Sequence, residues 1–346
     1  MPFLLSLLLL LTIAFQSFAA APKVKTNNKQ IPLAEPFVES IAEKLDMPTP
    51  EQNEVLDERD IIIGAVVELP MYSFYLGSPD LYGKAYVPNF SPRVGPRLVY
   101  KKIGLRAGFA LPLPDKEERR RGKSDQNNFI LSFYWKKFAF DFYYQFFKGF
   151  YVSSPLIELD LHKPDRFSQL PEAVSKHWGF NWYYNVSASQ FSLGSAFDQT
   201  EANMQAGDAL VIIPFYRYWR IDLGDRIIKG SDADSLDQIP NLSDGEFHTL
   251  GASIAYSKMW THRRTYFSML GGVGPAFQEQ SYTEKGNDKE RVTIAGKFNL
   301  NLSAGMKQKE YMMGSTLILD TIYSQVSNNE VYSTLLSLEL FLSRRF

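Results

Sequence analysis

The stretch FAFDFYYQFF, from Phe138 to Phe147, alternates between two kinds of side chain with a period of two. The large apolar positions are Phe138, Phe140, Phe142, Tyr144 and Phe146, and the positions between them are Ala139, Asp141, Tyr143 and Gln145. Successive side chains of a β-strand point to opposite faces of the sheet. This stretch therefore predicts a strand with one apolar wall and one more polar wall.

A second stretch, from Lys297 to Lys307, alternates in the same way. Phe298, Leu300 and Leu302 share one parity, and Asn299 and Asn301 share the other. An antiparallel sheet of a soluble protein can show this alternation too. These runs, however, reach the roughly 9–11 residues that a tilted strand needs to cross a bilayer, whereas ordinary strands have about 5–6. We therefore predict an all-β, transmembrane, antiparallel up-and-down β-barrel.

Thirteen segments after residue 60 are strand candidates. They are 61–76, 92–101, 104–113, 127–135, 138–149, 178–186, 191–198, 208–222, 246–258, 265–281, 291–307, 310–324 and 331–345. Single-chain bacterial barrels have even strand numbers, so we predict about twelve strands, with fourteen as the alternative. Short turns and long loops should alternate around such a barrel. The segment 150–177 breaks that rule, so the strand number between 150 and 210 stays open.

The first 60 residues show a different pattern. Residues 3–15 are almost wholly apolar and are followed by small residues, which predicts a cleaved signal peptide over 1–20. Residues 21–60 are polar and rich in proline, with Phe37, Ile41 and Leu45 at helical spacing. We predict a periplasmic segment with a short helix, or a plug, before the barrel of 61–346.

The chain ends on another alternating stretch. Leu338, Leu340 and Leu342 share the parity of the terminal Phe346. A last strand ending in phenylalanine resembles the signal by which outer-membrane barrels are recognised for assembly. We therefore predict these four residues as an assembly signal, and the barrel assembly machinery as a partner during biogenesis. Arg344 stands where that signal prefers an apolar residue.

Three stretches resemble a family of uncharacterised outer-membrane barrels, the domain-of-unknown-function family number 4421. They are YVPN (86–89) leading into VGPRLVYKKIGLRAGF (94–109), FILSFYWKKFAFDFYYQFFKGFYV (129–152) and the segment from Gln190 to Phe197. The resemblance covers roughly residues 60 to 346. It implies a barrel in the bacterial outer membrane and implies no catalytic residues.

Composition excludes several functions. The formal net charge is -1, without the basic excess of a nucleic-acid-binding domain. Cysteine is absent, which rules out thiol catalysis, zinc held by thiolates and disulfides. No phosphate-binding loop or metal-binding motif occurs, so we predict no metal and no cofactor.

Catalytic residues are not predicted either. Of the four histidines, His177 lies near Ser175 and His248 near Ser253. A histidine beside a serine could activate the hydroxyl of a membrane-embedded lipid hydrolase or acyltransferase. Neither pair stands in a motif of such enzymes, and a dyad is defined by geometry rather than by proximity in the sequence. An enzyme is therefore the third hypothesis.

Polar residues on the apolar strands are more informative. A charged side chain on the lipid face costs about 2–4 kcal/mol for Arg or Lys. We therefore predict that five polar residues of these strands face the lumen: Arg106, Asp141, Asn299, Asn301 and Asp320. Two functions fit them: a narrow pore for small polar solutes, or a closed structural or surface-interaction barrel whose interior is filled by paired charges.

The partners follow from the predicted location in the bacterial outer membrane. They are the lipids of that membrane, including lipopolysaccharide. The charged run from Lys116 to Lys123 is predicted to be a solvated loop, with contact to lipopolysaccharide phosphates as the alternative. The oligomeric state is left open.

Overall fold

The computed structural model describes most of the chain after residue 60. The described ranges are 61–77, 84–100, 103–135, 138–153, 165–186, 193–194, 206–224, 242–284, 286–308, 310–327 and 329–346. The predicted signal peptide and the N-terminal segment, residues 1–60, lie outside them.

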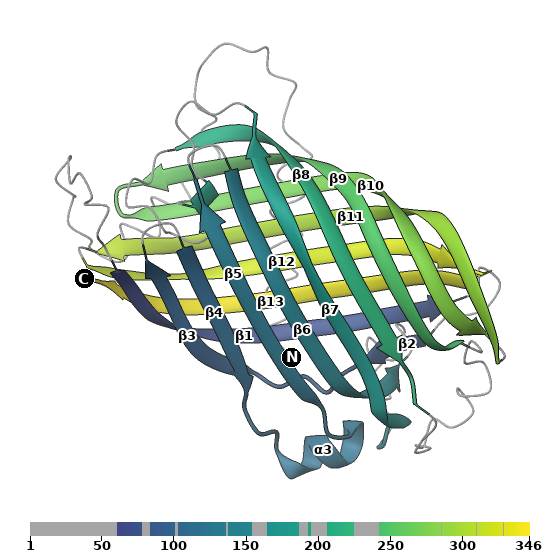
Figure 1. Cartoon of the computed structure of the whole chain (residues 1–346). Coiled ribbons are helices and arrows are strands. Elements are labelled where there is room, and N and C mark those ends of the chain that lie inside the picture. The colour runs from purple at the N-terminus through teal and green to yellow at the C-terminus, as the bar shows by residue number, and fades with distance from the viewer. Residues whose placement is uncertain are drawn as a thin grey trace, which may run out of the picture. The chain divides into compact units, whose positions relative to one another are not determined.

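Thirteen antiparallel strands form one sheet (Figure 1). They are β1 (Ile61–Gly77), β2 (Lys84–Val87), β3 (Arg93–Tyr100), β4 (Ile103–Ala110), β5 (Asp125–Tyr134), β6 (Phe138–Ser153), β7 (Gln169–Asn185), β8 (Gly207–Asp222), β9 (Leu242–His262), β10 (Thr265–Glu284), β11 (Asn287–Gln308), β12 (Tyr311–Val326) and β13 (Asn329–Arg345). A short helix, α3 (Asp115–Arg121), lies between β4 and β5. None of the helices in the described ranges is long and apolar enough to cross a membrane.

The sheet closes on itself. Strand β13 pairs with β1 from Ile62↔Arg345 to Gly77↔Glu330. The seam ends in a backbone pair, because the N–H of Phe346 donates to the carbonyl of Ile61 over 2.9 Å. Closure removes the sheet edges, which would otherwise present unpaired N–H and C=O groups. The closed barrel is the predicted fold.

Twelve strands pair with their neighbours in the chain around the ring, and the short β2 lies between β1 and β6 at one end of it. Strands β3 and β4 have 8 residues each, whereas β1 has 17 and β6 has 16. Where the short strands end, β2 pairs with both β1 and β6 and fills the gap. The prediction of about twelve strands is confirmed, and β2 is an addition that the sequence did not indicate.

The strand predicted over 191–198 is wrong. The structure describes only Leu193 and Gly194 of this range, and both are in a helical turn. Strand β7 pairs directly with β8, from Val174↔Asp222 to Asn185↔Val211, so no strand fits between them. Because there is no strand over 191–198, every strand before it runs in the direction opposite to the one that the sequence predicted. The long connection before β7 then lies at the same end as the connections 111–124 and 223–241, and the connection 186–206 becomes the exception to the alternation rule.

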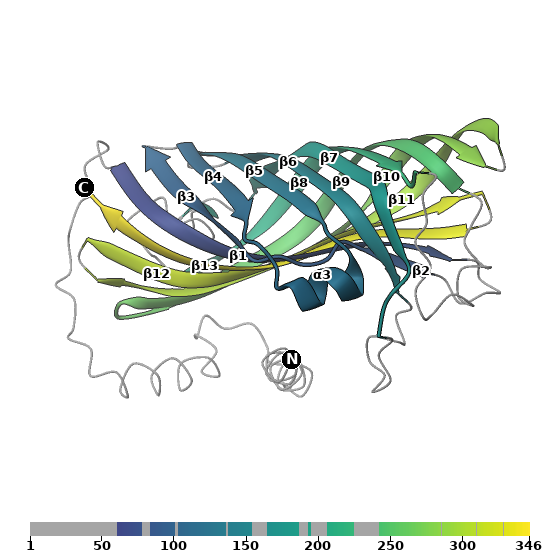
Figure 2. The same ribbon diagram turned by 90° about the horizontal axis from the view of Figure 1, so that it is seen from below.

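The two ends of the barrel differ (Figure 2). At the end where β1 begins and β13 finishes, strands are joined by the short connections 101–102, 135–137, 263–264 and 309–310, and by the longer 186–206. We call this the short-turn end. The opposite end, which we call the loop end, carries the longer connections 111–124, 154–168 and 223–241.

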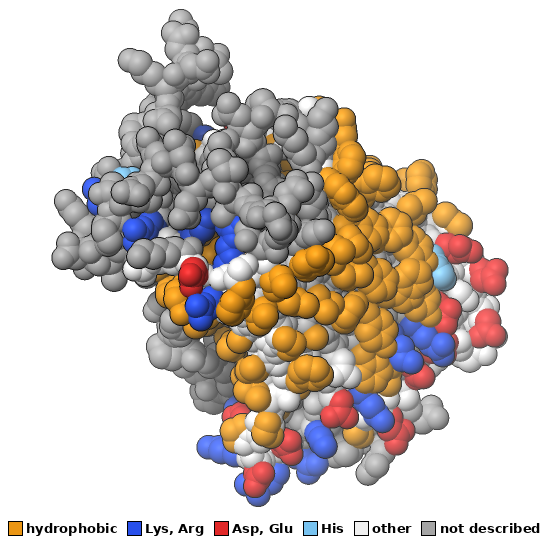
Figure 3. All heavy atoms as spheres, turned by 60° about the vertical axis from the view of Figure 1, so that its left-hand side comes forward, with side chains coloured by type: hydrophobic (Ala, Val, Ile, Leu, Met, Phe, Trp, Pro, Cys, Tyr) orange, Lys and Arg blue, Asp and Glu red, His pale blue; other side chains and the backbone are white. Residues whose placement is uncertain are grey.

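The outer wall is apolar. Ile294, Phe277 and Val292 expose 72%, 71% and 69% of their surface. Figure 3 shows one face of the molecule, on which hydrophobic side chains form a broad area with charged side chains at its margins. Along β13, Leu340, Leu342 and the terminal Phe346 are exposed and Leu338 is half-buried. The parity predicted for the last strand is therefore present, while its role in assembly stays a prediction.

The seam can be tested with cysteines, because the chain has none. Ala65 and Leu342 are paired across β1 and β13, and directly paired strand residues have Cα atoms within disulfide range. We expect Ala65→Cys with Leu342→Cys to form a disulfide in the oxidised barrel, seen as loss of thiol labelling. The control, Ala65→Cys with Phe341→Cys, puts the second thiol on the other face and should stay reduced. Equal cross-linking of both pairs would contradict the register.

Candidate functional site

The barrel interior holds a cavity of about 120 Å³. All five residues predicted to face the lumen line it: Arg106, Asp141, Asn299, Asn301 and Asp320. Strands from all sides of the ring contribute to the lining, because inward-facing parity recurs on every strand. Asp141, for example, lies between Ser132 of β5 and Asn181 of β7 in the strand register. The cavity is therefore the candidate site.

Ion pairs line this cavity. Arg106 Nη1 lies 2.7 Å from the Glu339 carboxylate, and Lys297 Nζ lies 3.1 Å from Asp320. Arg217 also contacts Asp320, at 3.5 Å. Taking a charge out of water costs several kcal/mol unless it is paired and hydrogen-bonded. Pairing therefore explains how a narrow lumen holds these charges.

Further hydrogen bonds span strands that are not neighbours. Lys297 Nζ on β11 donates to Asn181 Oδ1 on β7 over 2.7 Å. Arg217 Nη2 on β8 donates to Ser333 Oγ on β13 over 2.7 Å. Each of these bonds connects opposite walls, so the middle of the lumen is bridged by protein groups.

Sequence reasoning missed a second buried acid, Glu68. Its carboxylate accepts hydrogen bonds from Asn128 Nδ2 and Ser337 Oγ, each at 3.2 Å, and pairs with the fully buried Arg93 at 3.5 Å. The alternation of faces along a strand could have identified it. Glu68 is the one charged residue in the apolar β1, and it faces the same side as the inward-facing Tyr72.

Aromatic rings fill the loop-end half of the lumen. We call this group the aromatic cluster: Tyr72, Phe74, Tyr86, Phe147, Phe150, Trp219 and Phe247, each at most 4% exposed. Phe74 stacks on Tyr86 with ring centroids 4.6 Å apart, and Tyr72 stacks on Phe147 at 4.4 Å. The Phe74 ring also lies 6.0 Å from Trp219, which comes from β8 on the opposite side of the ring from β1. These contacts place aromatic rings across the lumen at this level.

A second apolar cluster lies toward the short-turn end. Val211, Ile213 and Leu270 are 0–1% exposed and belong to it. Leu193, from the connection between β7 and β8, packs into the same cluster and is 7% exposed. The polar cavity thus lies between two groups of packed apolar side chains.

The structure brings Ser175 and His177 together, although not as a catalytic dyad. Ser175 Oγ lies 2.8 Å from His177 Nε2, and Arg217 Nη2 lies 2.9 Å from His177 Nδ1. A guanidinium can only donate, so Nδ1 is the acceptor and Nε2 carries the proton. His177 therefore donates to Ser175 and cannot accept its proton, as a general base must. Trp219 Nε1 donates to the same hydroxyl over 3.0 Å.

The second predicted pair is separated by the barrel wall. Ser253 is fully buried on the inner face. His248 lies on the outer face, where its Nδ1 is 2.8 Å from the exposed Tyr216 hydroxyl. The described residues contain no group of three or more histidine or acidic side chains placed to hold a metal ion.

The charged run from Lys116 to Lys123 forms α3 and its flanks, rather than the loop that the sequence suggested. The backbone holds it in place: Phe167 N–H donates to the Arg120 carbonyl over 3.0 Å, and Asn89 Nδ2 donates to the Gly122 carbonyl over 2.8 Å. The Arg120 and Arg121 guanidiniums lie over aromatic rings at 5.5 Å from their centroids.

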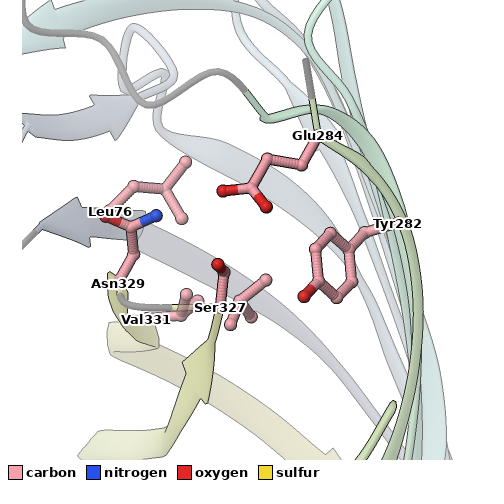
Figure 4. Close-up of a pocket in the computed structure, with 7 residues that line it drawn as sticks. Leu76, Tyr282, Glu284, Ser327, Asn329 and Val331 are labelled. Atoms are coloured by element: carbon pink, nitrogen blue, oxygen red, sulfur yellow. The ribbon is translucent and has the colours of Figure 1, made fainter. Parts of the chain in front are cut away.

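A small recess at the loop end is lined by Leu76, Tyr282, Glu284, Ser327 and Val331 (Figure 4). Its volume is about 10 Å³. One water molecule needs about 10–15 Å³, so the recess has room for one at most and is not a ligand site.

The closed antiparallel ring, with its apolar outer wall and polar, ion-paired interior, defines an outer-membrane type of β-barrel. The model of the family described as "Domain of unknown function (DUF4421)" matches residues 70–346. The chain belongs to this family, as the sequence resemblance implied. No curated protein matches the chain.

Solved structures with some likeness are outer-membrane proteins. The Escherichia coli outer membrane protease OmpT has a TM-score of 0.40 and 7% identity, covering 85% of this chain and 99% of its own. A bacterial polysaccharide outer membrane secretin has a TM-score of 0.34 and 9% identity, covering 84% and 99%. The Pseudomonas putida toluene transporter TodX has a TM-score of 0.27 and 7% identity, covering 84% and 91%.

The Arg106–Glu339 ion pair leads to a prediction about the stability of the barrel. We expect Arg106→Met to lower the free energy of unfolding by about 3 kcal/mol, because it leaves Glu339 buried without its cation. The double variant Arg106→Met with Glu339→Leu should recover most of that loss, because the carboxylate that lost its cation is then removed as well. Urea unfolding of the barrel refolded in vesicles measures both. Equal losses in the single and double variants would contradict this account.

The hydrogen-bond directions around Ser175 lead to a prediction about the reactivity of its hydroxyl. We expect no adduct at Ser175 after treatment with a fluorophosphonate, measured by peptide mass spectrometry. Ser175→Ala should cost about 1–3 kcal/mol of stability, because the buried Trp219 N–H loses its acceptor. An adduct at Ser175 that disappears in His177→Gln would show that the pair is catalytic after all.

Proposed function

We propose that this protein resides in the bacterial outer membrane as a closed barrel, one that does not conduct solutes and acts as a structural element or through its surfaces. The observation that carries this proposal is the contact of Phe74 with Trp219 across the lumen, inside the aromatic cluster. The barrel wall encloses a lumen, and aromatic rings occupy that lumen at the level of Phe74.

The outer wall supports the membrane location. In water, exposed apolar patches beyond a few hundred Å² are rare on monomeric proteins. Here the exposed apolar side chains recur on all sides of the ring, from Ile63 on β1 to Phe277 on β10 and Leu342 on β13. The strands are long enough for a bilayer, since β6 has 16 residues and β10 has 20. Lipid tails can solvate such an apolar surface. Closure of the sheet gives each backbone N–H and C=O group within the bilayer a hydrogen-bond partner.

The short-turn end then faces the periplasm and the loop end faces the outside, as in outer-membrane barrels generally. The aromatic cluster accordingly closes the outer half of the lumen. The narrow pore is supported by a different observation, the polar cavity of about 120 Å³. Conduction through it requires the rings of the aromatic cluster to separate.

Conductance of the purified barrel in planar bilayers tests the two functions. We expect the wild type to show no steps above background. Phe74→Ala with Trp219→Ala removes two rings from the constriction, so we expect it to produce steps of resolvable size. Phe74→Ala alone provides a milder variant in case the double variant folds poorly, and heat-modifiable gel migration reports folding in each case.

The matched control removes two aromatic rings from the outer wall. Phe138 and Trp182 are 36% and 49% exposed and do not enter the lumen. Phe138→Ala with Trp182→Ala should stay silent like the wild type. Wild-type steps as large as those of the lumen variant would contradict the closed barrel and establish the pore.

A further inference from the structure

In the described part of β8 to β13, the short-turn end of the barrel carries an excess of positive charge. Six basic side chains lie there in the described part of β9 to β13, and we call them the basic rim: Lys258, Arg263, Arg264, Lys307, Arg344 and Arg345. Two acidic side chains, Asp208 and Glu310, lie among them. The rim therefore keeps a net positive charge after both acids are counted.

Both acidic side chains already have partners within the barrel. Asp208 is the cross-strand neighbour of Lys258 and accepts a hydrogen bond from the Tyr256 hydroxyl over 2.9 Å. Glu310 pairs with Arg344 at 3.0 Å, and its side chain is 59% exposed. An exposed pair of this kind contributes only about 0–1 kcal/mol, so an anion from outside can compete for Arg344.

Two members of the rim lie against aromatic rings of the outer wall. Lys258 Nζ is 5.3 Å from the Trp260 ring centroid. The Arg344 guanidinium is 5.5 Å from the Tyr311 centroid and 5.0 Å from that of Phe346. Aromatic rings beside long basic side chains are typical of the boundary between lipid tails and headgroups.

The opposite end has a different charge pattern. There basic and acidic side chains alternate and pair, as Arg220 does with Glu246 at 3.1 Å and Arg121 with Glu117 at 3.6 Å. Among the described residues the positive excess is therefore a property of one end, while the full chain has a formal net charge of -1.

From this placement we propose that the basic rim binds the phosphate groups of anionic phospholipids in the leaflet at the short-turn end. The proposal rests on the proposed location in the membrane. The rim borders the apolar wall directly, because Met313 on β12 and Leu342 on β13 are exposed on the same face as Arg344. Headgroup phosphates lie at that level of a bilayer, whereas a soluble acidic protein would have to approach the turns from beyond it.

Native mass spectrometry of the detergent-solubilised barrel, titrated with phosphatidylglycerol or phosphatidylcholine, tests the proposal. We expect the wild type to retain more phosphatidylglycerol. Arg263→Asn with Arg264→Gln removes two charges from the turn between β9 and β10. Asparagine suits position 263 because its φ is 50°. A basic residue near an anionic membrane surface contributes about 1 kcal/mol, so affinity should fall about fivefold for each charge removed.

The matched control removes the same charge at the loop end, where Arg119 and Lys123 are exposed. Arg119→Gln with Lys123→Gln should bind phosphatidylglycerol like the wild type, and Arg264→Lys should retain most of the affinity because the charge is kept. Equal affinity of the wild type for both lipids, or equal losses in rim and control variants, would overturn the proposal. So would a rim that binds a soluble acidic polypeptide but shows no lipid preference.

A separate experiment tests the membrane location. Insertion of each variant into neutral vesicles, followed by heat-modifiable gel migration, does not depend on lipid charge. A wild type that inserts but shows no preference for phosphatidylglycerol overturns the basic rim alone. A wild type that fails to insert into any vesicle overturns the location.

Discussion

The closure of the sheet between β1 and β13 is the constraint on which the rest of this structure depends. In hydrocarbon no water is available to pair with an exposed N–H or C=O, so every backbone group needs a partner within the protein. A closed ring provides that partner along each strand, from Ile62↔Arg345 at one end of the seam to Gly77↔Glu330 at the other. The same demand explains β2, which pairs with β1 and β6 where the shorter β3, β4 and β5 no longer reach.

Closure also determines what the interior can be. Twelve strands enclose a narrow space, so inward-facing side chains from opposite walls meet. Where they are aromatic, as Phe74 and Trp219 are, their rings come into contact across the lumen. Where they are charged, as Arg217 on β8 and Asp320 on β12 are, they pair. The unbalanced charge of the basic rim and the exposed aromatic residues lie outside this interior, at the short-turn end and on the outer wall.

The alternation in the sequence was sufficient to assign faces, because the period of a strand is two whatever its neighbours are. It placed Asp141 and Asn299 on the inner wall and Leu342 on the outer wall. Strand number was harder to obtain. The four residues of β2 are too few to show a period, and Pro171 obscured the first part of β7, which begins at Gln169 rather than at residue 178. Contacts across the lumen, such as Lys297 with Asn181, depend on the radius of the ring and on 116 residues of intervening chain, so no local pattern reveals them.

The middle of the lumen is polar although apolar side chains pack on either side of it. Buried ion pairs contribute little net stability, and replacing them by apolar side chains is often neutral or favourable. The ion pairs have a larger effect on which strand register is stable than on the net stability of the barrel. A shift of one residue turns every side chain to the other face. In β6, such a shift would bring Asp141 to the lipid and Phe140 to the lumen, and in β4 it would bring Arg106 to the lipid at a cost of about 2–4 kcal/mol. We attribute the polar interior to this selection of register: an inner wall as apolar as the outer one would make the two faces interchangeable.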